Sequence, residues 1–274
     1  DLHSFPTRRS SDLPIDIRHI LFGHIQKILS TDNCIMSIYI NYDCDPHSSN
    51  LTQFIIENLL KMQMAIPESI PQVRKLLMTM IQTVKHGEPH GEEIHKKELK
   101  DNYEKVAIAF NANTQEGINL YCKLFYPENS EPTEVAVAEM FKTVRGLDKQ
   151  KIGDFFEKRK DFQIATLKEY LHEFVKEEDL LKGFVNFIQS TKLPKETNSI
   201  NHIFEDYSKY YCELHSGMDG DDVLLLISAI LLLNVELHHP VMKNKRTKEE
   251  FVHSMKETTP KIPVTVFETI YEYI

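Results

Sequence analysis

The sequence predicts an all-α fold. Three observations lead to this prediction: apolar residues recur at helical spacing along most of the chain, prolines and capping residues separate the apolar stripes, and no set of segments could be assembled into a sheet. With 274 residues and 41% apolar content, the chain is long enough to build one or two ordinary cores.

The first helices are predicted upstream of residue 86. Residues 1–13 carry no periodicity and resemble translated sequencing-adaptor sequence, so we expect them to be a non-native scar. An apolar stripe predicts a helix from Pro14 to Ser30, and further helices are predicted after Asn50, as a cap, and from Pro71. The chain has no initiator Met and stops inside an apolar pattern, which favours a fragment of a longer protein.

The segment between these helices, Cys34 to Tyr42, is rich in Ile and Tyr and favours a strand by composition. An isolated strand among helices would have no partner, so we predict a helix up to about Tyr42 and then a turn at Asp45-Pro46. The acidic side chains of Asp43 and Asp45 are interpreted as local caps of that turn.

Glycines and a proline interrupt the helical periodicity near residue 90. They predict a linker over 86–96 that separates an upstream helical region, 14–85, from a second domain, 97–274. Every segment of that second domain is predicted to be helical. Its most apolar run, Val223 to Leu233, predicts a helix that is buried on all sides.

Capping residues place several helix starts in the second domain. Asp148 and Asp161 are predicted N-caps, and Thr247 with Glu250 has the form of a capping box. Pro263 is predicted to begin the last helix.

Composition excludes several classes of function. The formal net charge is −9 and the basic residues are mixed with acidic ones, so the basic stripe of a nucleic-acid binder and a direct attraction to anionic lipid are not expected. The longest apolar run is well short of the roughly 20 residues that cross a bilayer. The four cysteines form no CxxC pair and no secretory leader precedes them, which favours a reduced, intracellular compartment. The histidines near the linker lie in a polar segment without helical periodicity, so no metal site is predicted.

The tetrapeptide Leu193-Pro194-Lys195-Glu196 is predicted to be a loop between two helices. Apolar residues at helical spacing lie on both sides of it, and Pro194 disfavours the helical conformation for the residue before it. Glu196 is thereby placed near the start of the next helix, where the helix dipole stabilises a carboxylate. A purely structural Glu196 therefore remains one reading of this loop.

A second stretch, Asn234 to Pro240, closes the apolar run. A Leu-Pro-x-Glu loop followed by Leu-Asn-x-x-Leu-His-x-Pro resembles the two signature motifs of the Sec-seven (Sec7) family, the guanine-nucleotide exchange factors for Arf GTPases. The resemblance covers roughly Lys97 to Ile274. Further matching stretches are Gly146-Leu147-Asp148-Lys149, Ile152-Gly153-Asp154 and Lys243-Asn244-Lys245-Arg246-Thr247.

The upstream region carries a resemblance of its own. Tyr39 to Asp45 is similar to the Asn-Tyr-Asp-Cys-Asp box found before the exchange domain in large, Golgi-type members of the brefeldin-A-inhibited class. It implies a regulatory region. Self-association through the upstream helices and peripheral recruitment from the cytoplasm to Golgi or endosomal membranes are therefore expected.

The Sec7 resemblance implies a fold and an activity for the second domain. The fold is a right-handed superhelical array of about ten helices. The implied activity is release of GDP from an Arf-family small GTPase in vesicle trafficking, with Glu196 as a glutamic finger entering the phosphate and magnesium site and Asn234 supporting the finger region. No cofactor and no covalent chemistry of its own are implied, because GDP, GTP and magnesium belong to the GTPase.

The same resemblance implies a GTPase-binding surface drawn from both motifs. Taken singly, its apolar members are explained by core packing, Asn234 by helix capping, and the histidines by loop hydrogen bonds. The co-occurrence of the motifs in order favours the binding surface. Its predicted members are Leu193, Pro194, Ile200, Phe204, Ser228, Ala229, Leu231, Leu232, Leu237 and His238.

Departures from the family pattern leave a second function open. Lys195 stands where the family usually has glycine, and His202 where it has an arginine, so backbone freedom and a bidentate contact are expected to be lost. These changes fit a non-catalytic helical adaptor that binds a GTPase or a trafficking partner. Ser228, Ala229 and Arg246 differ from the residues of brefeldin-A-sensitive members, so resistance to the drug is expected.

Overall fold

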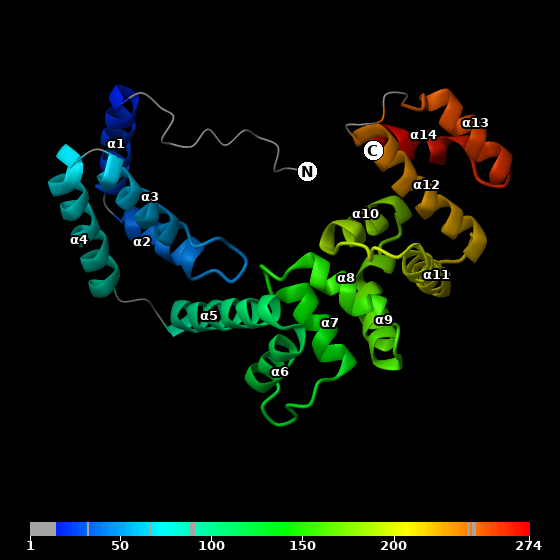
Figure 1. Ribbon diagram of the computed structural model, residues 1–274, viewed down its shortest axis with the longest axis horizontal. Coiled ribbons are helices and arrows are strands. Elements are labelled where there is room, and N and C mark those ends of the chain that lie inside the picture. Colours follow the sequence, from blue (N-terminus) through cyan, green and yellow to red (C-terminus); the bar gives the residue numbers. More distant parts are fainter. Residues whose placement is uncertain (1–14, 32, 66, 88–90, 240–241, 243–244) are drawn as a thin grey trace. The chain divides into compact units, whose positions relative to one another are not determined.

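The computed structural model describes residues 15–31, 33–65, 67–87, 91–239, 242 and 245–274. Every regular element within those ranges is a helix and none is a strand, which confirms the all-α prediction. The chain divides into two compact units, Asp1–Lys105 and Val106–Ile274. The elements of each unit are labelled in Figure 1. The predicted scar at 1–13 and Pro14 lie outside the described residues.

The first unit packs four α-helices around an apolar core. The core contains Phe22, Leu29, Ile35, Leu59, Val73, Leu76 and Met80. These residues come from α1 (Ile15–Leu29), α2 (Cys34–Ile38), α3 (Leu51–Ala65) and α4 (Ile70–His86). Two short elements, the π-helix η2 (Tyr39–Asp43) and the 3₁₀-helix η3 (Pro67–Ser69), lie between them in the chain.

The segment 34–43 is helical, as predicted, although its second half is a π-helix that ends at Asp43. The buried Asp43 carboxylate accepts a hydrogen bond from the Thr52 N–H at 2.9 Å, and Asp45 accepts one from the His47 N–H at 3.1 Å. Asp43 therefore caps the start of α3. The predicted cap, Asn50, is wrong, because its side-chain nitrogen donates to Glu104 and its buried side-chain oxygen has no partner.

Helix α5 (Gly91–Ala112) begins inside the predicted linker and continues without interruption into the second unit. Glu92 and Lys96 form an ion pair at 2.6 Å across one turn, an i,i+4 spacing that favours helix in an otherwise polar segment. The buried Lys100 ammonium donates to the Tyr42 carbonyl at 2.6 Å, which ties α5 to η2 within the first unit. The linker at 86–96 as a domain boundary remains a prediction.

The second unit contains the C-terminal part of α5 and nine further helices among its described residues. They are α6 (Thr114–Phe125), α7 (Glu134–Thr143), α8 (Lys149–Glu157), α9 (Asp161–Val175), α10 (Leu180–Ser190), α11 (Thr197–Leu214), α12 (Gly220–His238), α13 (Lys248–Thr258) and α14 (Val264–Tyr273).

A chain of aromatic side chains forms the core of this unit. Phe141 meets Phe155 edge to face at 5.3 Å between ring centroids, and Phe184 meets Tyr207 in the same way at 5.3 Å. Such contacts add to the free energy gained by burying the rings. The contact between Phe184 and Tyr207 joins α10 to α11, and the loop between these two helices carries Glu196.

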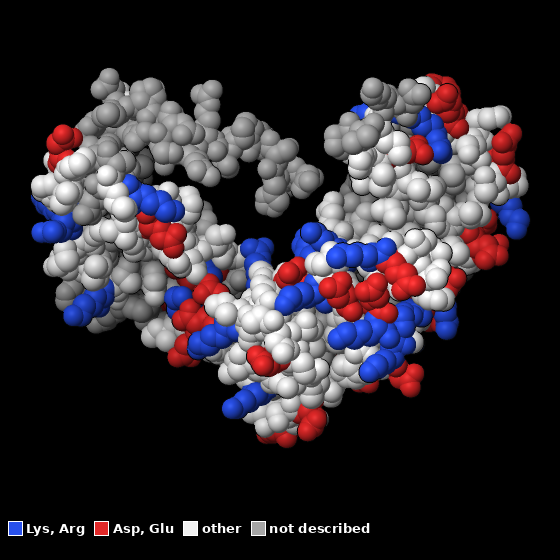
Figure 2. Space-filling view, in the orientation of Figure 1, with Lys and Arg blue, Asp and Glu red and all other residues white. Residues whose placement is uncertain are grey.

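Of the N-caps predicted in the second unit, two are confirmed and one is wrong. Asp148 accepts a hydrogen bond from the Gln150 N–H, and Thr247 with Glu250 forms a complete capping box, so both predictions are confirmed. Asp161 is wrong as an N-cap, because it is the first residue of α9 and Lys160 holds the cap position without a side-chain bond. On the face shown in Figure 2, basic and acidic residues are interspersed over both units.

Candidate functional site

The loop of residues 191–196 connects α10 to α11 and is hydrogen-bonded to the first residue of α8. The Lys149 carbonyl accepts hydrogen bonds from the Lys192 N–H at 3.2 Å and from the Thr191 hydroxyl at 3.3 Å. Thr191 and Pro194 are buried, whereas Lys195 and Glu196 are exposed. The base of the loop is therefore fixed and its tip lies in solvent.

Gly153 allows this close approach of α8 to the loop. A Cβ atom at position 153 would lie 2.1 Å from the Lys192 carbonyl oxygen, a distance that no side chain can tolerate without displacing the loop backbone. The two stretches of the sequence around Gly146 and Gly153 are thus explained by packing: one begins α8 and the other supports the loop.

Asn111 fixes the start of α8, a role that the sequence did not predict. Its side-chain nitrogen donates to the Gly146 carbonyl at 2.8 Å and its side-chain oxygen accepts from the Asp148 N–H at 2.7 Å. Gly146 has a φ of +82°, a backbone conformation that favours glycine. A lone Asn in α5 gives no sequence signal for this role, since its two partners are more than thirty positions further along the chain.

The end of α10 is anchored just before the loop. The Tyr170 hydroxyl donates to the Ser190 hydroxyl oxygen at 2.7 Å, and Ser190 in turn donates to the Phe187 carbonyl at 2.6 Å. Burial of Tyr170 raises the pKa of its hydroxyl to about 12, so the group remains a hydrogen-bond donor at neutral pH.

Glu196 occupies the N-cap position of α11 without acting as a cap. Its backbone is extended, with φ −81° and ψ 125°, and its carbonyl accepts from the Ile200 N–H at 3.1 Å, but its carboxylate makes no capping bond. No ion pair to Glu196 is found among the described residues. The carboxylate is thus an unpaired charge at the tip of a supported loop.

Lys195 does not force the loop into a strained shape. Among the described non-glycine residues, positive φ values occur at Asn33 and Arg159 alone, so Lys195 has an ordinary backbone conformation. The expected loss of backbone freedom at this position therefore leaves no strain in the loop. Lys195 instead adds a positive charge at the position before Glu196 in the sequence.

Helix α12 has one buried and one exposed apolar face, so the prediction that it is buried on all sides is wrong. Leu225, Leu232 and Val235 are 39%, 60% and 41% exposed, and at about 100° per residue they fall on one side of the helix. The opposite side carries Val223, Leu226, Ile227, Ile230 and Leu233, all buried. We call Leu225, Ser228, Ala229, Leu232 and Val235 the α12 stripe.

The predicted GTPase-binding residues divide between these two faces. Ser228, Ala229 and Leu232 belong to the α12 stripe, and Leu231 lies at its edge. Leu237 is half-buried and turns toward the opposite face. His238 is exposed, and its Nε2 lies 2.7 Å from the Ile274 carbonyl oxygen. Leu225 and Val235, also on the stripe, were not predicted, because an unbroken apolar run gives no signal of which side is exposed.

The predicted residues of the first motif lie at the base of the loop and along α11. Leu193 and Ile200 are half-buried, and Pro194 is buried. Phe204 is 3% exposed and packs edge to face on Phe184 at 5.3 Å, so in this structure it is a core residue. It supports α11 from inside the unit.

Asn234 lies in the interior of α12, four residues before the helix ends at His238. It is therefore not a terminal capping residue. Its half-buried side chain forms no hydrogen bond with the Thr191–Glu196 loop within the part of the chain that the structure describes. Pro240 and Lys243-Asn244 of the predicted motifs lie outside the described residues.

An ion pair joins Glu236 near the end of α12 to Arg246, which follows this helix in the chain. Arg246 donates to the Glu236 carboxylate at 2.9 Å, and the Tyr271 hydroxyl donates to the Arg246 carbonyl at 2.8 Å. These contacts hold α14 against the end of α12.

No cluster of side chains suited to a metal ion occurs among the described residues, and no described helix is long and apolar enough to span a membrane.

Comparison with known proteins identifies relatives of this chain. It is 21% identical over 329 residues to brefeldin A-inhibited guanine nucleotide-exchange protein 2 of Arabidopsis thaliana, an alignment that covers 93% of this chain and 18% of the relative. It is 30% identical over 175 residues to cytohesin-3 of Rattus norvegicus, covering 60% of this chain and 42% of the relative. The chain thus spans about a fifth of the first relative and under half of the second.

Solved structures share the fold of the second unit. The Sec7p catalytic domain matches with a TM-score of 0.56 at 20% identity, covering 62% of this chain and 92% of that one. A Sec7 domain bound to ARF1–GDP and brefeldin A matches with a TM-score of 0.55 at 22% identity, covering 64% and 90%. The family model of the Sec7 domain matches residues 99–274, which is more than half of the chain. The chain therefore belongs to the Sec7 domain family.

Proposed function

We propose that this chain promotes the release of GDP from an Arf-family small GTPase. The observation that carries the proposal is the unpaired Glu196 carboxylate at the tip of a loop whose base is fixed by α8. The names of the relatives and the solved complex of ARF1–GDP with a Sec7 domain support the choice of partner.

The proposed role of Glu196 is electrostatic. A small GTPase holds its nucleotide through backbone amides and a lysine around the phosphates, with magnesium bridging phosphate oxygens. A carboxylate carried into that site competes for the lysine, displaces the magnesium ion and repels the phosphate. The loop suits this role because the Glu196 carboxylate forms no ion pair that would have to break before it enters the phosphate site of the GTPase.

The α12 stripe is the proposed docking surface. Its exposed leucines and valine present an apolar strip to solvent on a helix whose other face is locked into the core. Ile200, half-buried at the start of α11, and Leu193 at the base of the loop are proposed to belong to the same docking surface. Phe204 is assigned a supporting role, because its ring packs inside the unit. Asn234 is proposed to position α12, with no direct contact to the loop.

The first unit is proposed to serve self-association and recruitment, without catalytic residues. Ile28 and Phe54 are exposed beside a cavity of ≈ 220 Å³ whose lining is apolar, and Ile25 and Met62 also line it. Such a patch on a small helical unit fits a protein partner or a second copy. Peripheral action on Golgi or endosomal membranes in vesicle trafficking is proposed from the relatives' class alone.

A non-catalytic adaptor is the second candidate, and the charge beside Glu196 favours it. The Lys195 ammonium attracts phosphate and opposes the finger. The His202 Nδ1 atom lies 3.0 Å from a Glu205 carboxylate oxygen within α11. An imidazole has no guanidinium fork, so His202 cannot make the bidentate contact that an arginine would make.

Nucleotide release separates the two functions. Stopped-flow measurement of a fluorescent GDP analogue leaving each of a panel of Arf-type GTPases should show acceleration by this chain. A pull-down of the nucleotide-free GTPase run beside it reports docking. Docking to at least one GTPase without acceleration of release from any of them would establish the adaptor and overturn the exchange proposal.

A further inference from the structure

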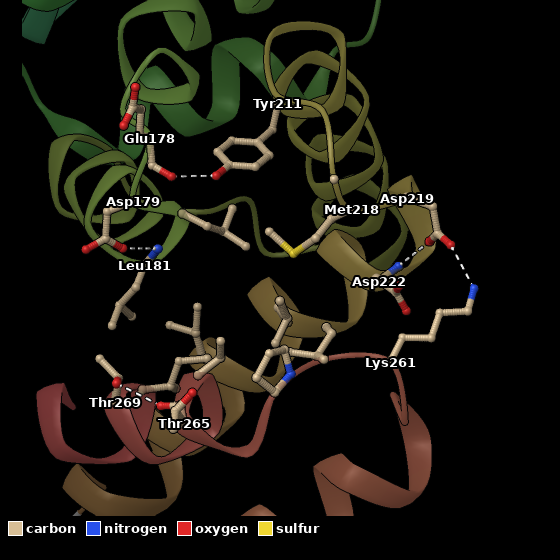
Figure 3. A pocket seen from close by; sticks show the side chains of 18 residues that line it. Glu178, Asp179, Leu181, Tyr211, Met218, Asp219, Asp222, Lys261, Thr265 and Thr269 are labelled. Carbon is tan, nitrogen blue, oxygen red and sulfur yellow. Dashed lines mark hydrogen bonds and ion pairs between the residues drawn. The ribbon is translucent and has the colours of Figure 1, made fainter.

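A cavity of ≈ 610 Å³ lies on the side of α12 that faces away from the α12 stripe (Figure 3). Its walls come from the start of α10, from α11, from the α11–α12 connection, from α12 and from the segment Lys261–Ile270. Leu226 and Ile230 line it, and both belong to the buried face of α12. The cavity is therefore separate from the proposed docking surface, and nothing in the proposed exchange reaction uses it.

The walls of the cavity are mainly hydrocarbon. Leu181, Met218, Ile262, Val266 and Ile270 line it together with the two α12 side chains. Two hydroxyl groups of the wall already have partners: the Tyr211 hydroxyl donates to the Glu178 carbonyl at 2.7 Å, and the Thr269 hydroxyl donates to the Thr265 carbonyl at 2.8 Å. An apolar body can therefore enter without leaving these groups unsatisfied.

Acidic side chains stand at the edge of the cavity. Asp179 is held by the N–H groups of Leu181 and Lys182, and Asp219 is held by the Asp222 N–H at 2.9 Å. Asp222 lines the cavity as well. One ammonium group, that of Lys261, lies 3.7 Å from Asp219. With Glu178, the lining thus contains four acidic side chains and one ammonium group, and two of the carboxylates are fixed in place by backbone bonds.

We propose that this cavity binds a small organic cation that has an apolar body and a protonated amine or guanidinium group. The volume lies within the roughly 300–1,000 Å³ of small-molecule sites, and such sites combine apolar walls with a few placed polar groups. The excess of carboxylates selects a positive head group. A phosphate- or carboxylate-bearing ligand would be repelled at the same edge, which separates this site from the nucleotide chemistry of the proposed partner.

The test compares three probes with one hydrocarbon body: 4-phenylbutylamine, 4-phenylbutanol and 4-phenylbutyrate. Binding is followed by NMR of the full chain with labelled Ile, Leu, Val and Met methyl groups. The amine should shift the methyl signals of Met218, Ile230 and Ile270 saturably, with an affinity about tenfold higher than that of the carboxylate at low salt, because opposite charges attract and like charges repel across a few ångströms. The alcohol should fall between them.

Matched variants of the chain locate the site. Val266 and Val264 are 36% and 39% exposed on the same helix, but Val266 alone of the two lines the cavity. Val266→Trp should therefore abolish amine binding and Val264→Trp should leave it unchanged. Asp222→Asn should reduce the preference for the amine, whereas Asp221→Asn, in the same first turn of α12, should not.

Absence of binding by all three probes would overturn the proposal, as would equal affinities for amine and carboxylate. Amine binding that survives Val266→Trp in a folded variant would also overturn it, by placing the ligand elsewhere. The Asp222→Asn comparison keeps the proposal testable if Val266→Trp does not fold. None of these measurements requires a GTPase, so failure of the exchange proposal would not affect them.

Discussion

Two acidic turns of this protein use their carboxylates in opposite ways. In the first unit, Asp43 and Asp45 both accept hydrogen bonds from neighbouring backbone N–H groups. In the second unit, the Glu196 carboxylate accepts none, although its loop is just as firmly attached through Thr191 and Lys192.

The difference separates structural from available charge. A carboxylate that satisfies buried N–H groups stabilises the fold, and its charge cannot be moved without exposing those groups. A carboxylate held at a helix start without a partner contributes little to stability. Its charge is available to another molecule, which is what nucleotide exchange by repulsion requires.

The largest expected effect is on Glu196. Two unit charges about 4 Å apart at an effective dielectric near 20 interact by about 4 kcal/mol, which corresponds to roughly a thousandfold in rate. Glu196→Gln should lose much of the acceleration of GDP release, and Glu196→Lys should lose more, because an ammonium group attracts phosphate. Stopped-flow release of fluorescent GDP measures the effect.

The control for this charge change is Glu213→Lys, on the exposed far end of the same helix. It should leave the release rate and the melting temperature unchanged. A Glu196→Lys variant that exchanges as fast as the parent would reduce Glu196 to an ordinary carboxylate at a helix start.

The anchor of α10 should give the loop a dependence on alkaline pH. The pKa of Tyr170 is raised to about 12 in the folded protein, against roughly 10 in the unfolded chain. The stabilisation is therefore complete below pH 10 and lost as the pH rises toward 12, since the unfolded chain releases its proton first; it amounts to about 3 kcal/mol. Tyr170→Phe should flatten the fall in unfolding free energy over that window, measured by denaturant titration. An unchanged slope would contradict the assignment.

Gly153→Ala should displace the supported loop. The new methyl group would sit 2.1 Å from the Lys192 carbonyl oxygen, and overpacking of this kind costs about 1–3 kcal/mol. We expect a lower melting temperature together with slower GDP release. Gly23→Ala is the matched control, because a Cβ there meets no atom within 4 Å. Unchanged release by a folded Gly153→Ala variant would show that the position of the loop does not matter for exchange.

Asp43→Ala should affect stability alone. It removes the cap from Thr52 at the start of α3, and losing a helix cap costs about 0.5–2 kcal/mol. Amide hydrogen exchange at Thr52 should accelerate, while GDP release by the second unit should stay at the parent rate. Asp43→Asn retains an acceptor oxygen and should lie between the two. Slower GDP release in Asp43→Ala would mean that the first unit takes part in exchange.

The smallest effect is expected at Lys195. If its ammonium lies roughly 8 Å from the phosphate in a water-like dielectric, it holds the nucleotide by about 0.5 kcal/mol, or about twofold in rate. Lys195→Gly should therefore speed GDP release by about that factor, and raising the salt concentration should shrink the gain. A slower Lys195→Gly variant would indicate that the lysine assists the finger.

Local chemistry made part of the second unit predictable. The capping box at Thr247 and the cap at Asp148 follow from side chains that reach only two or three residues along the chain. Asn50 and Asp161 had the same local signal and do not cap, because in α3 a competing acceptor, Asp43, reaches the first-turn N–H, and in α9 the helix begins at Asp161 itself.

The sequence by itself determined the helical class, the order of the helices, and the placing of Glu196 on a loop between two of them, because periodicity, proline and caps act locally. It could not decide which face of α12 meets solvent, because an uninterrupted apolar run has no polar side to mark it. It also could not reveal that Phe204 is inside, that Asn111 holds the start of α8, or that Gly153 supports the Glu196 loop. Those roles depend on contacts between residues far apart in the chain, and only tertiary packing brings them together.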